Sequence, residues 1–173
     1  MTLKLSDYDP AVKQGAVVDA QTDVTVVDDL TVNDDLAVVG LVTIGETLAV
    51  VGSVLTSGPT SGIGYSTGAG GAVTQATSKS TGVTLSKVTG TITTHAETLA
   101  AAAEVTFIVT NTNVAITDVI VLSIQSGGTS GEYTANVTDV GAGVFDITLA
   151  NLSASSASDA VLINFAVIKA VVA

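Results

Sequence analysis

Residues 24–54 read VTVVDDLTVNDDLAVVGLVTIGETLAVVGSV, and this stretch repeats every six residues. An aliphatic residue opens each unit, and a second one follows two places later. A spacing of two is the alternation of a β-strand, and the Asp, Gly or Glu at the fifth place is typical of a turn. Each unit therefore predicts a short strand and a corner. The core positions that we expect are Val24, Val26, Leu30, Val32, Leu36, Val38, Val42, Ile44, Leu48 and Val50.

The number of repeats indicates how many chains are needed. Short hexads are typical of a β-solenoid, in which units form the sides of a triangular prism around a shared core. Five full hexads in a single chain would give fewer than two layers, whereas such folds need about three repeats. Three parallel chains would instead give about five layers. The sequence therefore predicts a homotrimeric β-prism, or β-helix, shaft over residues 21–56, and ordinary strands of a sandwich are the alternative.

Composition limits the classes of partner. The 173 residues are 47% apolar and 3% aromatic, which favours β-structure because Val and Thr are abundant. Five lysines, no arginine and sixteen acidic residues give a net charge of −11. Such a surface repels phosphate groups, so we expect neither a nucleic acid nor a membrane as partner. The chain has no cysteine, which excludes disulfides and thiolate metal sites.

Three further segments flank the shaft. Residues 1–20 lack periodicity and form an expected attachment arm, with Leu3, Leu5, Tyr8 and Val12 as its apolar anchors. Residues 57–71 are rich in Gly, Ser and Thr, which indicates a connector. Residues 72–173 predict a jelly-roll-like antiparallel β-sandwich. Its eight expected strands lie at or near 72–77, 82–85, 91–94, 104–110, 118–124, 132–138, 143–150 and 159–172, and the weak helix candidate is HAETLAAAAE at 95–104.

The last of these strands is apolar on both alternating faces. One face carries Val161, Ile163, Phe165 and Val167, and the other includes Leu162, Ala166 and Ile168. Such a strand suits burial on both sides, and a small sandwich core covers only one of them. We therefore expect this strand to contact a neighbouring subunit, with Val161, Ile163, Phe165 and Val167 as the interface residues.

Residues with catalytic or ligand-binding potential are few. His95 is the only histidine, and we interpret it as an exposed surface side chain. The sequence contains no nucleophile motif, such as G-x-S-x-G, that would indicate a catalytic triad with it. The run GAGGAVTQ lacks the third glycine of a dinucleotide fingerprint, so its glycines indicate a hinge and a turn. Asp28, Asp29, Asp34 and Asp35 would form acidic rings in a trimer. Calcium is one possible occupant, but solvated corners are the preferred interpretation. No enzymatic activity, metal or cofactor is predicted.

The runs GAGGAVTQATSKSTGVTLSKVTGTIT, EVTFIVTN and LINFAVIKAVV resemble a domain of tailed-bacteriophage head-fibre and capsid-decoration (cement) proteins. The resemblance covers about residues 63–173, and the segment VTQATSKSTGVTL is its most specific part. The hexads are also similar to repeats in phage fibres. The resemblance implies a trimeric virion protein without enzymatic activity.

Two functions follow as expectations. In the first, the trimer binds the major capsid protein on the outer surface of the virion and stabilises the shell. In the alternative, the chain belongs to a tail fibre or spike whose sandwich binds a host receptor, such as a surface glycan. The short shaft and the few exposed aromatic candidates favour decoration.

Overall fold

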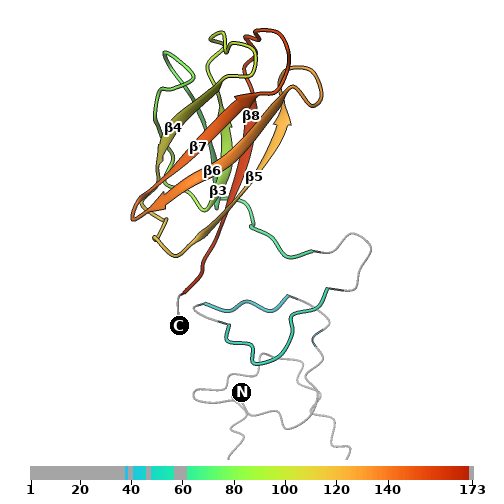
Figure 1. Cartoon of the computed structure of the whole chain (residues 1–173). Coiled ribbons are helices and arrows are strands. Elements are labelled where there is room, and N and C mark those ends of the chain that lie inside the picture. Colours follow the sequence, from blue (N-terminus) through green and yellow to red (C-terminus); the bar gives the residue numbers. More distant parts are fainter. Residues whose placement is uncertain (1–37, 39–40, 46–47, 57–61, 172–173) are drawn as a thin grey trace, which may run out of the picture. The chain divides into compact units, whose positions relative to one another are not determined.

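The computed structural model describes residues 38, 41–45, 48–56 and 62–171 (Figure 1). The chain divides into two compact units, Met1–Leu55 and Thr56–Ala173. The second unit holds every described strand, and each of the eight expected strands is present. The strands are β1 (Gly70–Thr74), β2 (Val83–Thr84), β3 (Thr89–Thr93), β4 (Glu104–Thr110), β5 (Val119–Ser126), β6 (Tyr133–Gly141), β7 (Val144–Asn151) and β8 (Leu162–Ile168).

The strands form two sheets of four. Sheet A has the order β1-β3-β8-β5 and sheet B the order β2-β4-β7-β6, and Figure 1 shows the two layers facing each other. The all-β sandwich is therefore confirmed. The expected antiparallel pairing is wrong for two pairs, because β1 runs parallel to β3 and β2 runs parallel to β4.

The parallel pairs follow from the path of the first four strands. These strands alternate between the sheets, with β1 and β3 in sheet A and β2 and β4 in sheet B. A chain that crosses to the opposite sheet and returns has reversed its direction twice, so it comes back parallel to the strand that it left. The later pairs β4–β7, β6–β7, β3–β8 and β5–β8 are all antiparallel.

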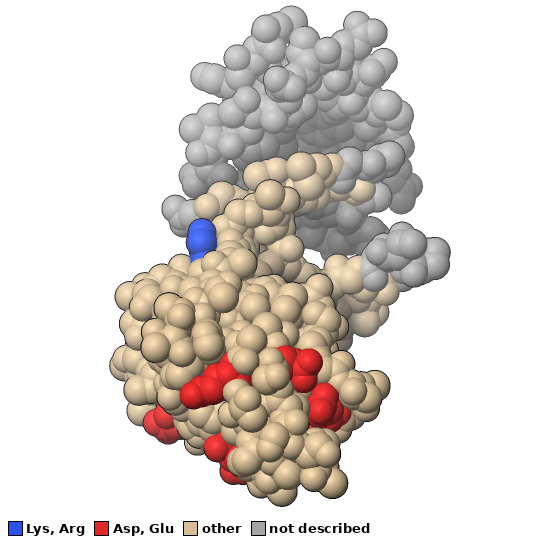
Figure 2. Space-filling model, turned by 90° about the horizontal axis from the view of Figure 1, so that it is seen from above, with Lys and Arg blue, Asp and Glu red and all other residues tan. Residues whose placement is uncertain are grey.

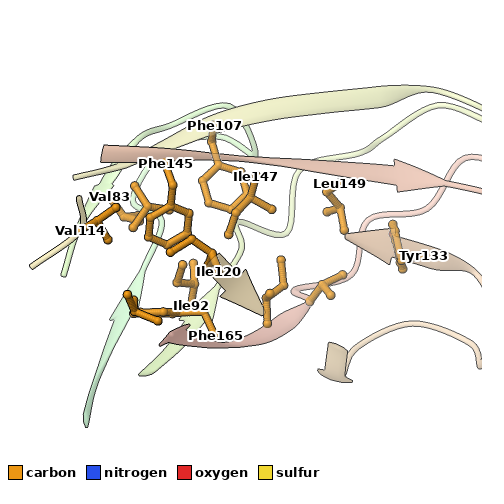
Figure 3. Close-up of a cluster of buried hydrophobic side chains, with 14 of the residues drawn as sticks. Val83, Ile92, Phe107, Val114, Ile120, Tyr133, Phe145, Ile147, Leu149 and Phe165 are labelled. Atoms are coloured by element: carbon orange, nitrogen blue, oxygen red, sulfur yellow. The ribbon is translucent and has the colours of Figure 1, made fainter. Parts of the chain in front are cut away.

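Aromatic and branched aliphatic side chains from both sheets fill the space between them (Figure 3). Phe145 of β7 and Phe165 of β8 meet across this core, with ring centroids 5.6 Å apart and planes inclined by 55°, a tilted geometry that aromatic pairs favour. Alternation along β8 and along β7 as far as Leu149 supplies these inward residues, since neighbouring side chains in a strand point to opposite faces.

The segment between β3 and β4 contains the weak helix candidate, and the described chain is not helical there. Leu99 pairs with Ala157 in an isolated β-bridge and is buried in the core. Ala102 has a φ of 55°, which an α-helix does not accommodate. The alanine-rich composition favours a helix locally, but burial of Leu99 in an extended segment prevails. The part of the chain that the structure describes contains no helix long and apolar enough to cross a membrane.

Two glycines that were expected in the connector belong to β1. Gly70 and Gly71 pair with Thr89 and Gly90 of β3, so the sandwich begins before residue 72. A Cβ atom on Gly90 would lie 2.7 Å from the Gly71 carbonyl oxygen and 2.8 Å from Leu85 Cδ2. Gly71 and Gly90 therefore allow Leu85 to pack closely on the β1–β3 pair. The glycines of GAGGAVTQ thus include strand positions and do not form only a hinge and a turn.

Candidate assembly surfaces

The described hexads leave their apolar side chains exposed. At the first and third places of each unit the exposed fraction lies between 44% and 65%, for Val38, Val42, Ile44, Leu48, Val50 and Val54. Aliphatic side chains at other places are more exposed, from 87% to 106%, for Leu41, Val51 and Leu55. The expected core positions are thus the more sheltered ones, yet none is buried. A row of half-exposed aliphatic side chains is typical of a surface that another chain covers.

Other predicted residues lie outside the described residues. They are the shaft positions Val24, Val26, Leu30, Val32 and Leu36, the arm positions Leu3, Leu5, Tyr8 and Val12, and the acidic pairs Asp28, Asp29, Asp34 and Asp35. Their roles stay predictions.

Strand β8 offers a partner a different face from the one predicted. Val161, Ile163, Phe165 and Val167 are at most 2% exposed and lie in the core of their own chain. Sheet B already covers them, so they cannot also meet a second subunit. The alternate positions face outward: Leu162, Asn164 and Ala166 are half-buried and Ile168 is exposed. Any subunit contact of β8 therefore falls on this outer row.

Lys79 is a buried cation in the loop between β1 and β2, with only 1% of the residue exposed. Its Nζ donates hydrogen bonds to the carbonyl oxygens of His95 and Asp159, each at 2.6 Å. It also lies 5.9 Å from the centre of the Tyr133 ring, within the range of a cation–π contact. His95 follows β3 and Asp159 precedes β8, so one ammonium group joins three loops.

Gln75 and Glu97 complete this polar cluster. The Gln75 amide nitrogen donates to the carbonyls of Lys79 and Thr81, at 2.9 and 2.8 Å, and its oxygen accepts from the His95 amide at 3.0 Å. Glu97 Oε2 accepts from the Lys79 amide at 2.9 Å. The segment VTQATSKSTGVTL, which carries the sequence resemblance, is therefore held in shape by its own buried polar residues.

The titration of this cluster reflects its burial. Burial lowers the pKa of the Lys79 ammonium, while the carboxylates of Asp159 and Glu97 oppose that change. Burial also raises the pKa of the Tyr133 phenol, whose hydroxyl donates to Asp159 Oδ2 at 3.2 Å. A perturbed lysine is a frequent mark of a catalytic site. Here its ammonium is covered and bonded to two carbonyls, which fits an anchor of loops.

His95 differs from its expected environment, because it is half-buried and not fully exposed. Its Nδ1 atom is buried without a hydrogen-bond partner among the described residues. No group of three His, Cys, Asp or Glu side chains that could hold a metal ion occurs within residues 62–171 or the described hexad positions.

A second polar cluster fixes the end of β8. The Asp118 carboxylate is almost fully buried and accepts hydrogen bonds from the Ala115 amide at 2.8 Å and from Lys169 Nζ at 2.5 Å. Thr117 Oγ1 donates to the Ala170 carbonyl at 2.7 Å, and the Tyr65 hydroxyl donates to the Val167 carbonyl. The Ala115 amide first, and then Lys169, lower the pKa of Asp118. The loop before β5 and the chain after β8 are thereby joined.

The outer surface of the sandwich carries mostly acidic charge. In the view of Figure 2 the acidic side chains gather on one part of the described surface, and a wide area beside them carries no acidic side chain. Three of the five lysines lie in the described residues, and two of these, Lys79 and Lys169, are engaged in the clusters above. The charge pattern thus separates acidic areas from uncharged ones, and the uncharged areas are the candidates for contact with an acidic partner.

Comparison of the chain with protein-family models, with curated proteins and with solved structures gave no match.

Proposed function

We propose that the chain is a structural virion protein, a homotrimer that binds the outside of a phage capsid and stabilises it. The observation that carries this proposal is the row of half-exposed aliphatic side chains at the hexad positions, such as Val42, Ile44 and Leu48. Three parallel copies would bury these side chains against one another. In a single chain, the side chains of the described hexads stay exposed. The resemblance of residues 63–173 to head-fibre and cement proteins supports the viral setting.

A trimer of this kind acts by mass action on the shell. A ligand that binds the assembled capsid, and not its separated subunits, favours the assembled state in proportion to its occupancy. Several weak contacts per trimer add through effective concentration. The acidic charge suits an outer position, because like charge would oppose a place beside the packaged genome.

The test compares complete particles with particles stripped of this protein. We expect stripped particles to release DNA at a lower temperature, and re-addition of the trimer to restore the original temperature. If both kinds of particle open at the same temperature and only adsorption to host cells falls, the chain is a receptor-binding fibre or spike protein instead.

The attachment arm has a separate test. The chain without residues 1–20 should remain a trimer, because the shaft and the sandwich are retained, and it should fail to bind stripped particles. Undiminished binding would place the capsid contact on the sandwich.

A further inference from the structure

The outward face of sheet A carries no charge. At the outward positions of β1, β3, β8 and β5, the described residues are all Gly, Ala, Val, Leu, Ile, Ser, Thr, Asn or Gln. The outward face of sheet B differs, because it carries Glu104, Asp139 and Asp146. In a chain of net charge −11, one sheet is thus acidic outside and the other neutral.

Exposed aliphatic side chains gather at one side of this neutral face. Val119 lies opposite Ile168 in the β5–β8 register, and Val121 lies opposite Ala166. Val119, Val121 and Ile168 are 52%, 48% and 53% exposed. Beside them is an open hollow of about 440 Å³, whose lining includes Gly70, Thr89, Val121, Asn164 and Ala166. The face therefore combines exposed apolar side chains with a recess that can receive side chains of a partner.

Two threonine hydroxyl groups of this face already donate hydrogen bonds within the chain. Thr89 Oγ1 donates to the Phe165 carbonyl and Thr91 Oγ1 donates to Asn164 Oδ1, both at 2.9 Å. Burying a polar group is costly when it loses its hydrogen bond to water and gains no other. Because these hydroxyl groups already have acceptors, a partner can cover them at little cost.

The charge pattern indicates what the partner is. A basic partner would gain most from the acidic face of sheet B, through complementary charge. A second copy of this acidic chain would be repelled from that face and meets no repulsion at sheet A. The neutral face thus fits contact between identical chains.

We propose that the outward face of sheet A is where the sandwich domains of neighbouring copies contact one another, around β5 and β8. This inference rests on the proposed trimer and adds the surface through which its outer domains meet.

Cysteine cross-linking of the full-length protein tests the surface, because the natural chain has no cysteine. Val121→Cys places a thiol on the neutral face, and Thr106→Cys places an exposed thiol on the face of sheet B as the matched control. With a short bis-maleimide reagent, we expect covalent dimers from Val121→Cys and almost none from Thr106→Cys, because one thiol per chain lets the reagent join chains only in pairs. Equal cross-linking of the two variants, or stronger cross-linking of Thr106→Cys, would overturn the inference.

Charge insertion gives a second readout. Val121→Asp should raise the concentration at which the assembly dissociates in sedimentation by about tenfold or more, because like charges at a contact cost several kcal/mol. Thr106→Asp should leave it nearly unchanged.

The outcomes separate the two proposals. A trimer that cross-links only through sheet B would reject the sheet A contact and leave the proposed function standing. A chain that is monomeric at all concentrations would reject both. If Val121→Asp stays trimeric at every dilution and Val121→Cys does not cross-link, the neutral face does not bind a second copy, and binding of the variants to stripped capsids would show whether it contacts the shell.

Discussion

Single polar residues determine how the loops of this sandwich are held. Lys79 and Gln75 are buried, although their residue types are mostly exposed in proteins. Periodicity indicates buried positions where polar residues alternate with apolar ones, as Asp146 and Thr148 alternate with Phe145 and Ile147 in β7. It could not identify Lys79, since the carbonyl groups that bind it come from positions 95 and 159. The segment VTQATSKSTGVTL carries the sequence resemblance, but its own residues do not indicate which carbonyl groups Lys79 binds.

Replacement of Lys79 should destabilise the sandwich. Lys79→Met keeps much of the side-chain volume and removes the donor from two partly buried carbonyl groups. A fully buried polar group costs about 1–3 kcal/mol when it is left unsatisfied, so partly buried ones should cost less each. We expect a clear fall in the urea midpoint of unfolding. Lys87→Met is the control, because the Lys87 side chain is exposed. If both substitutions lower the urea midpoint equally, the hydrogen bonds of Lys79 do not stabilise the sandwich.

Asp118 should make stability depend on acid pH. Its pKa is lowered in the folded chain, so the unfolded chain binds a proton more readily at this group. The stabilisation is therefore present above the unfolded pKa of about 3.9 and is lost as the pH falls from there through the lower folded pKa.

Urea unfolding at pH 6 and pH 3 checks this dependence. Asp118→Asn should be less stable than the natural chain at pH 6 and should lose less stability on acidification. Asp139→Asn, which alters an exposed carboxylate on sheet B, serves as the control. If the natural chain and Asp118→Asn differ in free energy of unfolding by the same amount at pH 6 and at pH 3, the role assigned to Asp118 is contradicted.

Among the elements, strand positions were predictable and strand partners were not. Alternation and turn residues are local signals, so all eight strands could be predicted. Which strands pair depends on how the chain crosses from one sheet to the other. The pattern of apolar residues does not indicate whether β3 pairs with β1 or with another strand. The two faces of β8 show the same limit. Both faces are apolar in sequence, and only the position of sheet B decides that Phe165 points inward and Ala166 outward.

The contact between β1 and β3 requires glycine at one inward position. Gly90→Ala would bring a Cβ atom to 2.7 Å from the Gly71 carbonyl oxygen, and backbone atoms there cannot yield without shifting a strand. Overpacking of this kind costs about 1–3 kcal/mol. Thermal unfolding should show a lowered midpoint for Gly90→Ala. In Gly70→Ala, where the nearest atom would be 3.4 Å away, the midpoint should change little.

For the whole molecule, assembly and folding should be inseparable in the shaft. If hexads of three chains share one core, Leu36→Asp places three charges at one level of a narrow apolar prism, where unpaired charge is costly. We expect this variant to lose the trimer in sedimentation experiments. Ala37→Asp, one position along and pointing away from the predicted core, should still assemble. Normal assembly of Leu36→Asp would contradict the prism.

The position of β8 within sheet A has a consequence for biosynthesis. β8 is the last strand of the sandwich along the chain, yet it lies in the sheet interior, between β3 and β5. While a ribosome is still making residues 162–168, the nascent chain holds β1 and β3 on one side of a gap and β5 on the other. Sheet A can close only after the final strand emerges, and pairings between strands so distant in sequence form slowly. Until then β3 and β5 both present open edges, and such edges are prone to pair with strands of other newly made chains.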